Sequence, residues 1–266
     1  MTVLDEILAT KRDEVTMLHR PQVRELLRAQ ALAAPPTRDF VGALRPVDGT
    51  IGVIAEFKRR SPSKGDLAPD LDPAVTAKAY AAGGASCLSV LTDQHYFGGT
   101  VDDLVAARGA CELPVIRKDF TIDEVQIYEA RAIGADAVLL IVAALPENSL
   151  LTDLHELAVS LGLAVLVEAH DDAELERARA VGARIVGVNA RNLDTFAEDL
   201  GVGERLASRL PSAVVAVAES AIRSVDDAAR MAAAGFDAVL VGEMLVKASD
   251  ATASVRGLTA IPRTPR

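Results

Sequence analysis

Short apolar runs that end in charged residues recur along the chain, and the clearest example is residues 51–58. This run reads Ile-Gly-Val-Ile-Ala-Glu-Phe-Lys. Because successive side chains of a β-strand alternate between its two faces, Glu56 and Lys58 share one face, while Ala55 and Phe57 share the other. If the apolar face packs outward, Glu56 and Lys58 point into a common interior. A buried acid and a buried base are costly there unless they are paired or take part in chemistry.

A joint between a helix and a strand occurs four times after this run. Each copy has an alanine-rich helix, a turn that contains glycine and a short Val/Ile/Leu strand, and the copies begin at Ala82, Ile133, Val181 and Ala234. We expect the glycine to end each helix. Further apolar runs at residues 53–57, 114–117, 163–167 and 214–218 bring the predicted strands to eight. Their spacing of roughly 20 to 35 residues is the length of a βα unit.

The continuous apolar character of these strands predicts parallel strands that are covered on both sides. Eight βα units close into a (β/α)8 TIM barrel, an α/β fold. Ahead of the first strand, residues 2–17 have helical spacing, a second helix covers about residues 21–31, and residues 40–49 form a connector rich in turn formers. We therefore predict one domain over residues 1–266, with a helical extension and connector (1–49), a barrel (50–258) and a tail (259–266). The extension should pack an apolar face across the barrel and its loops.

Composition narrows the choice of partners. The chain has 266 residues, half of them apolar, a formal net charge of −10, no Trp and 3% aromatic residues. Nucleic-acid binding would need a basic face and usually stacking rings, so small-molecule partners are expected instead. Cys87 and Cys111 lie in or beside apolar runs and are expected to be reduced core thiols. There is no export signal and no apolar run of roughly 18 residues, which predicts a cytoplasmic protein that does not bind membranes.

The polar residues at the predicted strand ends are the candidates for chemistry, because active sites of such barrels lie at the carboxyl ends of the strands. In order, the ends carry Glu56/Lys58, Thr92/Asp93, Lys118/Asp119, Val142/Ala143, Glu168, Asn189, Glu219/Ser220 and Gly242/Glu243. A solvated rim charge is an equally good interpretation of any one of them taken alone. It does not account for the whole set.

A phosphate site is indicated by three segments together. The loop at 61–65, Ser-Pro-Ser-Lys-Gly, offers hydroxyls, a cation and a flexible backbone, and residues 218–221 and 241–243 follow the seventh and eighth strands. Barrels of this type often bind phosphate there, on backbone N–H groups. The four histidines have no metal-ligand spacing, so no metal is predicted. We expect His170 to be a surface residue and His95 to close a loop.

Five motifs, taken in order, resemble those of the indole-3-glycerol phosphate synthase family. They are residues 54–65 (Ile-Ala-Glu-Phe-Lys-Arg-Arg-Ser-Pro-Ser-Lys-Gly), 114–123 (Pro-Val-Ile-Arg-Lys-Asp-Phe-Thr-Ile-Asp), 166–170 (Leu-Val-Glu-Ala-His), 188–193 (Val-Asn-Ala-Arg-Asn-Leu) and 218–221 (Ala-Glu-Ser-Ala). The resemblance implies a carboxy-lyase of tryptophan biosynthesis. It would close the ring of 1-(2-carboxyphenylamino)-1-deoxyribulose 5-phosphate, losing carbon dioxide and water, without a metal or an organic cofactor.

The resemblance also implies roles for the site residues. Lys118 would donate to the developing oxyanion, and enclosure could lower its pKa so that it acts as an acid. Lys58, held by Glu56, would bind the benzoate of the substrate. Glu168 and Lys58 are the candidates for the acid and the base of the dehydration, in an order that stays open.

The remaining assignments concern binding. Asn189 and Ser220 would hydrogen-bond sugar hydroxyls or the carboxylate, and Glu219 would help to fix the lysines. The residues implied to bind the substrate or its phosphate are Ser61, Lys64, Arg191, Ala221, Gly242 and Glu243. Two of these depart from the common pattern, since Ala221 replaces Gly and Glu243 replaces Ser. The methyl group that Ala221 adds is tolerable if φ stays negative there. We expect Glu243 to use only its backbone N–H and to turn its carboxylate away.

Two other functions fit the fold. One is a different phosphosugar barrel, such as phosphoribosylanthranilate isomerase, which would need a Cys/Asp pair or metal ligands at strand ends. The other is a phosphate-binding barrel without catalysis, which would not need Lys118 and Glu168. The oligomeric state does not follow from the sequence, and a monomer is compatible with it.

Overall fold

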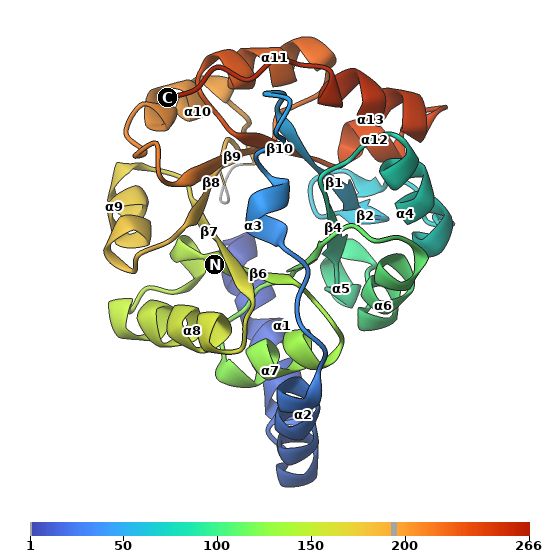
Figure 1. The fold of residues 1–266 in the computed structure, drawn as a ribbon. Coiled ribbons are helices and arrows are strands. Elements are labelled where there is room, and N and C mark those ends of the chain that lie inside the picture. The colour runs from blue at the N-terminus through green and yellow to red at the C-terminus, as the bar shows by residue number, and fades with distance from the viewer. Residues whose placement is uncertain (1, 193–195) are drawn as a thin grey trace.

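The computed structural model describes residues 2–192 and 196–266, so Met1 and Leu193, the last residue of the fourth motif, lie outside it. Eight parallel strands form a closed barrel in the order β1-β10-β9-β8-β7-β6-β5-β4 (Figure 1), as the sequence predicted. These strands are β1 (Gly52–Phe57), β4 (Cys87–Leu91), β5 (Val115–Lys118), β6 (Ala137–Ile141), β7 (Ala164–Ala169), β8 (Ile185–Asn189), β9 (Val215–Glu219) and β10 (Ala238–Val241).

Helices form a ring around the strands (Figure 1). They are α4 (Pro73–Ala82), α6 (Val101–Ala110), α7 (Glu124–Ala132), α8 (Asn148–Ser160), α9 (Asp172–Ala180), α10 (Leu200–Ala207), α11 (Val225–Ala233) and α13 (Ala251–Thr259). The four predicted joints each contain a glycine in the left-handed region, with φ between 76° and 98° at Gly84, Gly134, Gly182 and Gly235. This conformation ends a helix and costs glycine no steric strain, so the predicted role of these glycines is confirmed.

The strands separate an outer core from an inner one. Val53, Ala55 and Phe57 of β1 pack in the outer cluster, between strands and helices. Ile54 belongs to the inner cluster, inside the barrel. Since side chains alternate along a strand, Glu56 lies on the inner side with Ile54. The face assigned to Glu56 from the sequence is therefore confirmed.

The amino-terminal ends of the strands are joined by side chains from the repeated joints. Asp136 Oδ2 accepts a hydrogen bond from Val115 N at 2.9 Å. At the equivalent place in the last joint, Asp237 Oδ2 accepts one from Ala216 N at 2.9 Å. Arg266 pairs with Asp237 at 2.8 Å, so the segment after residue 258 packs against the barrel instead of hanging free as a tail. This end of the barrel serves stability.

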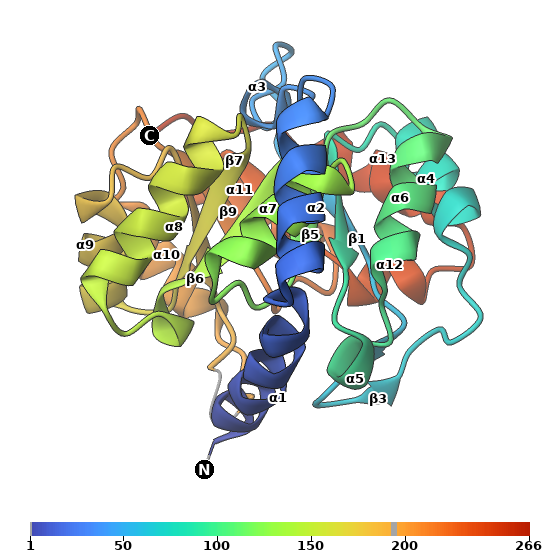
Figure 2. The ribbon, with the colours of Figure 1, turned by 90° about the horizontal axis from the view of Figure 1, so that it is seen from below.

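The amino-terminal extension crosses the length of the barrel. It contains α1 (Val3–Leu18), α2 (Pro21–Ala33) and α3 (Phe40–Ala43). Figure 2 shows α1 at the end of the barrel where α5 and β3 lie, and α3 at the opposite end. The sequence predicted the first two helices. It did not predict α3, which forms within the connector because Asp39 Oδ1 caps it by accepting from Gly42 N at 2.9 Å.

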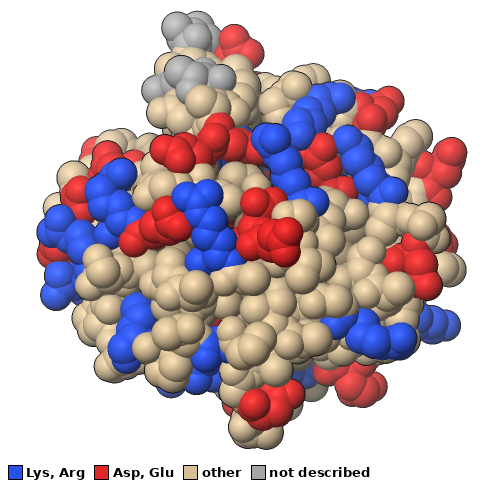
Figure 3. Space-filling view, turned by 90° about the horizontal axis from the view of Figure 1, so that it is seen from above, with Lys and Arg blue, Asp and Glu red and all other residues tan. Residues whose placement is uncertain are grey.

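The loops that follow the barrel strands contain a small hairpin and short helical turns. They are the hairpin β2 (Arg60–Ser61) with β3 (Gly65–Asp66), the helical turns α5 (Gln94–Phe97) and α12 (Glu243–Val246), and the 3-10 turn η1 (Val142–Ala144). Within the described ranges, no helix has the length and apolarity needed to cross a membrane. Positive and negative side chains are interspersed over the face drawn in Figure 3, which carries no large basic area.

The two cysteines differ in burial. Cys87 is completely buried in the inner cluster and lies 3.8 Å from the carbonyl oxygen of Phe40. Cys111 is only half-buried but packs against the outer cluster, so it lies at the edge of the core and not inside it as expected. It follows the last residue of α6, where the chain turns at the surface.

A buried lysine anchors α1 over the strand ends. Lys11 is 1% exposed. Its Nζ lies 2.8 Å from Asp119 Oδ1, 3.0 Å from Asp93 Oδ2 and 2.7 Å from Glu14 Oε2. Burial raises the pKa of Asp119, but Arg117 and Lys11 outweigh it and bring that pKa to about 2. The charge of Lys11 thus compensates two buried carboxylates that follow strands β4 and β5.

Lys11→Met should lower the free energy of unfolding by about 3–5 kcal/mol, because it removes the cation that lies 3.0 Å from the buried Asp93 carboxylate and leaves buried Asp119 with Arg117 alone. Asp119 has a folded pKa below its unfolded one, so its stabilisation is complete above about pH 4 and is lost as the pH falls towards 2. Without Lys11 the folded pKa of Asp119 lies closer to its unfolded value, so the variant should lose less stability than the wild type when the pH falls. Urea denaturation at neutral and acidic pH measures both effects. Lys78→Met, on the exposed side of α4, is the control and should change neither.

Candidate active site

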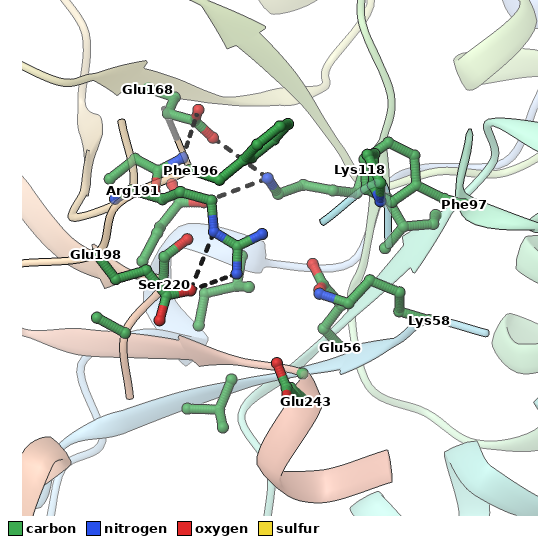
Figure 4. Close-up of a pocket in the computed structure, with 18 of the residues that line it drawn as sticks. Glu56, Lys58, Phe97, Lys118, Glu168, Arg191, Phe196, Glu198, Ser220 and Glu243 are labelled. Atoms are coloured by element: carbon green, nitrogen blue, oxygen red, sulfur yellow. Dashed lines mark hydrogen bonds and ion pairs between the residues drawn. The ribbon is translucent and has the colours of Figure 1, made fainter. Parts of the chain in front are cut away.

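The carboxyl ends of the strands surround a cavity of about 430 Å³, shown in Figure 4. Most of the predicted site residues line it, namely Glu56, Lys58, Lys118, Glu168, Asn189, Arg191, Glu219, Ser220, Ala221, Gly242 and Glu243. Ser61 and Lys64 are not part of the lining, although Pro62 between them is. The closed barrel brings these residues together because parallel strands end on the same side.

Lys58 and Glu56 form a pair at the end of β1. Lys58 Nζ donates to Glu56 Oε1 at 2.7 Å, and Ser89 Oγ donates to Glu56 Oε2 at 3.3 Å. Burial by itself would raise the pKa of Glu56, but the ammonium groups of Lys58 and Lys118 lower it. Glu56 is therefore an ionised carboxylate in the barrel interior. Gly242 leaves room for it, since a Cβ at that position would lie 2.6 Å from Glu56 Oε1.

Lys118 lies between two other carboxylates. Its Nζ is 3.2 Å from Glu168 Oε2 and 3.4 Å from Glu219 Oε2 (Figure 4). Burial lowers the pKa of Lys118, but the attraction of Glu168, Glu219 and Glu56 outweighs it and raises that pKa above its usual value. The expectation of a lowered pKa for Lys118 is therefore wrong. Enclosure alone would have lowered it, and the surrounding carboxylates reverse the sign.

Glu168 is held from three sides. Besides Lys118, Asn189 Nδ2 donates to Glu168 Oε1 at 2.9 Å, and His170 Nε2 lies 3.3 Å from the same oxygen. Burial raises the pKa of Glu168, while Lys118 and His170 together lower it well below its usual range. The side chain of His170 is only 14% exposed and also contacts Glu174. Our expectation of a surface histidine is therefore wrong, because the loop after β7 folds His170 inward against both carboxylates.

The pKa of Glu219 shifts in the opposite direction from that of Glu168. Burial raises its pKa, Lys118 lowers it less, and the nearby charge of Glu168 raises it further, to about 8. Among the described residues, no hydrogen-bond partner reaches its buried Oε1. Gly187 of β8 provides the space, because a Cβ there would lie 1.9 Å from that oxygen. Of two adjacent carboxylates, Glu168 is thus the stronger acid and Glu219 the weaker one.

The loops opposite these acids carry cations that already have partners. Arg191 Nε donates to Glu198 Oε1 at 3.0 Å, and the guanidinium also reaches Ser63 Oγ at 3.5 Å. Lys64 Nζ donates to Glu243 Oε2 at 2.7 Å. We expected the carboxylate of Glu243 to turn away from the predicted phosphate loop, and this expectation is wrong. The carboxylate is bound to Lys64 of that loop. Burial raises the pKa of Glu243, and Lys247 and Lys64 lower it to about 2.

The turn after β9 is strained. Ser220 has a φ of 65° and Ala221 a φ of 59°. Both values lie in the left-handed region, so the condition under which the methyl group of Ala221 would be tolerated without strain is not met. Side chains other than glycine pay a steric cost there. Residues held in such conformations cluster at functional sites.

Apolar side chains that the sequence did not assign to the site cover the cavity. Val3, Leu4 and Ile7 of α1 line it, as do the three phenylalanines Phe97, Phe120 and Phe196. The expectation that the extension packs across the loops is confirmed for α1. The phenylalanines come from three different loops, so no local pattern groups them, although Phe120 lies inside the second motif. Together these groups form a wall suited to an aromatic ring.

Metal binding has no geometric support in the described part of the chain. There, no three His, Cys, Asp or Glu side chains come together in a way that could hold an ion. The cations in the cavity belong to lysine and arginine, which do not act as ligands in their charged forms. The chemistry available to these side chains is therefore proton transfer and charge stabilisation.

Comparison with known proteins agrees with this arrangement. The family model described as indole-3-glycerol phosphate synthase matches residues 4–258. A protein of that name from Laribacter hongkongensis is 49% identical over 264 residues, which cover 97% of this chain and 99% of the relative. Another from an Arthrobacter species is 51% identical over 255 residues, covering 95% and 93%.

Solved structures of other enzymes share only the fold. The 3-hexulose-6-phosphate synthase of Salmonella typhimurium has a TM-score of 0.65 at 15% identity, covering 79% of this chain and 98% of that one. A thiamine phosphate pyrophosphorylase of Pyrococcus furiosus has a TM-score of 0.60 at 16% identity, covering 83% and 96%.

Ala221→Gly should stabilise the protein by about 0.5–1 kcal/mol. It removes a left-handed strain of about 1–2 kcal/mol but increases the freedom of the unfolded chain. Ala234→Gly is the matched control, because Ala234 has a φ of −72° at the end of α11, and this variant should lose about 0.5–1 kcal/mol. Denaturant titration of both variants measures these changes in the free energy of unfolding. A loss of stability in both would mean that the turn at Ala221 is not strained.

Proposed function

The chain belongs to the indole-3-glycerol phosphate synthase family, and from this membership we propose how the side chains of its cavity divide the reaction. The protein is a carboxy-lyase of tryptophan biosynthesis. It closes the ring of 1-(2-carboxyphenylamino)-1-deoxyribulose 5-phosphate, with loss of carbon dioxide and water. The observation that carries the proposal is the separation of two lysines, each with its own carboxylate partner.

Lys118 serves the developing oxyanion. Ring closure joins a benzene carbon to the carbonyl carbon and places negative charge on the carbonyl oxygen. An ammonium group that is already charged, as the raised pKa of Lys118 implies, can stabilise that charge and donate a proton to it. Glu168 and Glu219, at 3.2 and 3.4 Å, hold the ammonium in place. The high pKa is no obstacle, because an alkoxide is a stronger base than the amine.

Lys58 serves the carboxylate of the substrate before it leaves. Its ammonium is held at 2.7 Å from Glu56 and its side chain is 13% exposed, so it remains within reach of the cavity. The benzoate would take Glu56's place as the nearest anion or share the cation with it. The aromatic ring itself would lie against the apolar wall formed by α1 and the phenylalanines.

Glu168 and its neighbours serve the dehydration and the sugar. Loss of the hydroxyl as water needs an acid, and loss of the proton from the adjacent carbon needs a base. Glu168 is ionised and so suits the base. Asn189 orients Glu168 and, with Ser220, offers hydrogen bonds to the sugar hydroxyls. Glu219, with a pKa near 8, carries a proton near neutral pH and fixes Lys118.

The phosphate binds at the opposite side of the cavity, between the hairpin β2–β3 and α12. Arg191 lines the cavity there, and Lys64 and Ser61 supply a cation and a hydroxyl from the hairpin. Backbone N–H groups of Ala221, Gly242 and Glu243 complete the site. The carboxylate of Glu243 lies 2.7 Å from Lys64 Nζ, so the phosphate competes with this carboxylate for the lysine.

Three wider assignments are part of this proposal. The enzyme acts in the cytoplasm, where a biosynthetic enzyme without disulfides would work. A monomer is sufficient for the reaction, since the lysines, carboxylates and apolar wall named above belong to one chain. The extension and connector (1–49), the barrel (50–258) and the segment 259–266 form one domain.

Lys118→Met and Lys58→Met should differ in which kinetic constant they change. Because Lys118 meets a charge that exists only during ring closure, Lys118→Met should lower kcat and kcat/KM together, by about 10²- to 10³-fold, with little loss of binding. Lys58→Met should also weaken binding of an analogue that keeps the carboxylate, more than it weakens binding of the product. Steady-state kinetics and titration with analogue and product measure this contrast. If Lys118→Met loses analogue affinity while Lys58→Met keeps it, the two assignments are reversed.

Glu243→Gln should tighten the binding of inorganic phosphate as a competitive inhibitor by about two- to fivefold. The substitution keeps the size of the side chain and removes a carboxylate that competes for Lys64, in a half-exposed pair whose coupling is typically below about 1 kcal/mol. Glu204→Gln, which breaks a surface pair with Arg230, is the control and should leave phosphate inhibition unchanged. Weaker phosphate inhibition in Glu243→Gln would contradict the competition.

A further inference from the structure

The reaction takes up a proton each time it occurs. The carbonyl oxygen gains two protons as it leaves as water, while the adjacent carbon loses one. The carboxylate leaves as carbon dioxide and leaves its bonding electron pair on the ring carbon. The balanced reaction is therefore substrate carboxylate plus one proton, giving the indole product, carbon dioxide and water. Solvent must return that proton to the enzyme before the next turnover.

The groups that exchange protons with the substrate are poorly placed to collect one from solvent. Glu168 is 1% exposed and Glu219 is 2% exposed. Lys118 has a side-chain exposure of 15%, but its ammonium points between these two carboxylates. Because Glu168 lines the cavity, a substrate bound there would cover the approach of solvent from that side. A second route behind Glu168 would solve the problem.

Such a route is present in the loop after β7. His170 Nε2 lies 3.3 Å from Glu168 Oε1, on the side away from Lys118, which contacts Oε2. This is an ion-pair contact without hydrogen-bond geometry, and among the described residues nothing else accepts from the buried Nε2, so a small turn of the imidazole brings its proton onto Glu168. On the other edge of the imidazole, Nδ1 lies 2.9 Å from Glu174 Oε2. The side chain of Glu174 is 18% exposed, at the start of α9. The imidazole thus stands between a fully buried carboxylate that faces the cavity and a partly exposed carboxylate on the outer side.

We propose that His170 is a proton-relay residue, which passes a proton from Glu174 and solvent to Glu168 in each turnover and does not contact the substrate. The inference rests on the proposed function, in which Glu168 takes part in proton transfer. His170 begins as the cation and gives its Nε2 proton to Glu168, which restores Lys118. The neutral imidazole then takes a new proton from solvent or from Glu174. One proton enters per turnover, which matches the balance of the reaction.

The charges around His170 determine when its proton moves to Glu168. Burial lowers the pKa of His170, but Glu168 and Glu174 raise it to about 10, so the imidazole starts as the cation. The charged groups that face it are Glu168 on β7 and Glu174 on α9, with Lys118 of β5 beyond Glu168. Once Lys118 has given its proton to the oxyanion, Glu168 loses the cation that most lowers its pKa. Its proton affinity rises at the moment when the site lacks a proton.

The test is chemical rescue of His170→Gln. Its steady-state kcat should fall by about 10²-fold, the low end of the range for loss of a proton-transfer group. Imidazole added at increasing concentration should restore the rate, because a diffusing base can carry the missing proton. The rate of a single turnover, which uses the protons already on the enzyme, should fall much less. Glu174→Gln keeps an acceptor for the His170 backbone N–H, now bound at 2.8 Å, and should show a milder loss of the same kind.

His155→Gln is the matched control, since His155 is a half-buried histidine of α8 that does not line the cavity. It should keep normal turnover with or without imidazole. An unchanged kcat in both His170→Gln and Glu174→Gln would overturn the relay. So would a lowered rate that imidazole does not restore and that is lost equally in a single turnover, because His170 would then only position Glu168. Near-normal turnover of Glu168→Gln would instead reject the proposed role of Glu168 itself.

Discussion

The placement of the Lys118 ammonium between carboxylates is the interaction on which the site depends. Glu168 and Glu219 come from strands β7 and β9 and would repel each other in a dry interior without a cation between them. With Lys118 present, the two carboxylates separate into a strong acid and a weak one, whose pKa is near 8. Lys118 keeps Glu168 ionised, while burial and the charge of Glu168 keep Glu219 protonated, so an ionised base and a protonated acid lie within a few ångströms of each other. Divergent pKa values of this kind are typical of sites for proton transfer.

The two ends of the barrel differ in their contribution to stability. Stabilising hydrogen bonds and ion pairs lie at the amino-terminal ends of the strands, and the buried charges of the site lie at the carboxyl ends. At the amino-terminal ends, Asp136 and Asp237 accept backbone N–H groups and carry arginine partners. At the carboxyl ends, the glycines Gly187 and Gly242 leave room for Glu219 and Glu56 where any other side chain would collide. Buried carboxylates and a strained turn destabilise the second end. The closed sheet and its outer core supply the stability that allows them.

The amino-terminal extension adds what the barrel strands lack. Their ends provide charge, but the apolar wall of the cavity comes partly from α1, through Val3, Leu4 and Ile7. That helix is held by Lys11, whose partner Asp119 is the residue after Lys118. The positions of α1 and of the Lys118 ammonium are therefore connected through residues 118–119. Charge and apolar enclosure meet at the same strand end, as a reaction on an aromatic acid requires.

The sequence was sufficient for the barrel, its glycine joints and the set of residues around the cavity, because strand periodicity and helix ends depend on near neighbours. It was not sufficient for properties set through space. The raised pKa of Lys118 depends on Glu168, which is 50 residues away. The left-handed φ of Ala221 depends on how the turn after β9 meets the barrel, and the bond between Glu243 and Lys64 depends on two loops that meet only in the folded chain. His170 looked like a surface histidine because nothing local shows that its ring lies between two carboxylates. Closure of the barrel decides these features, since it alone determines which charges become neighbours.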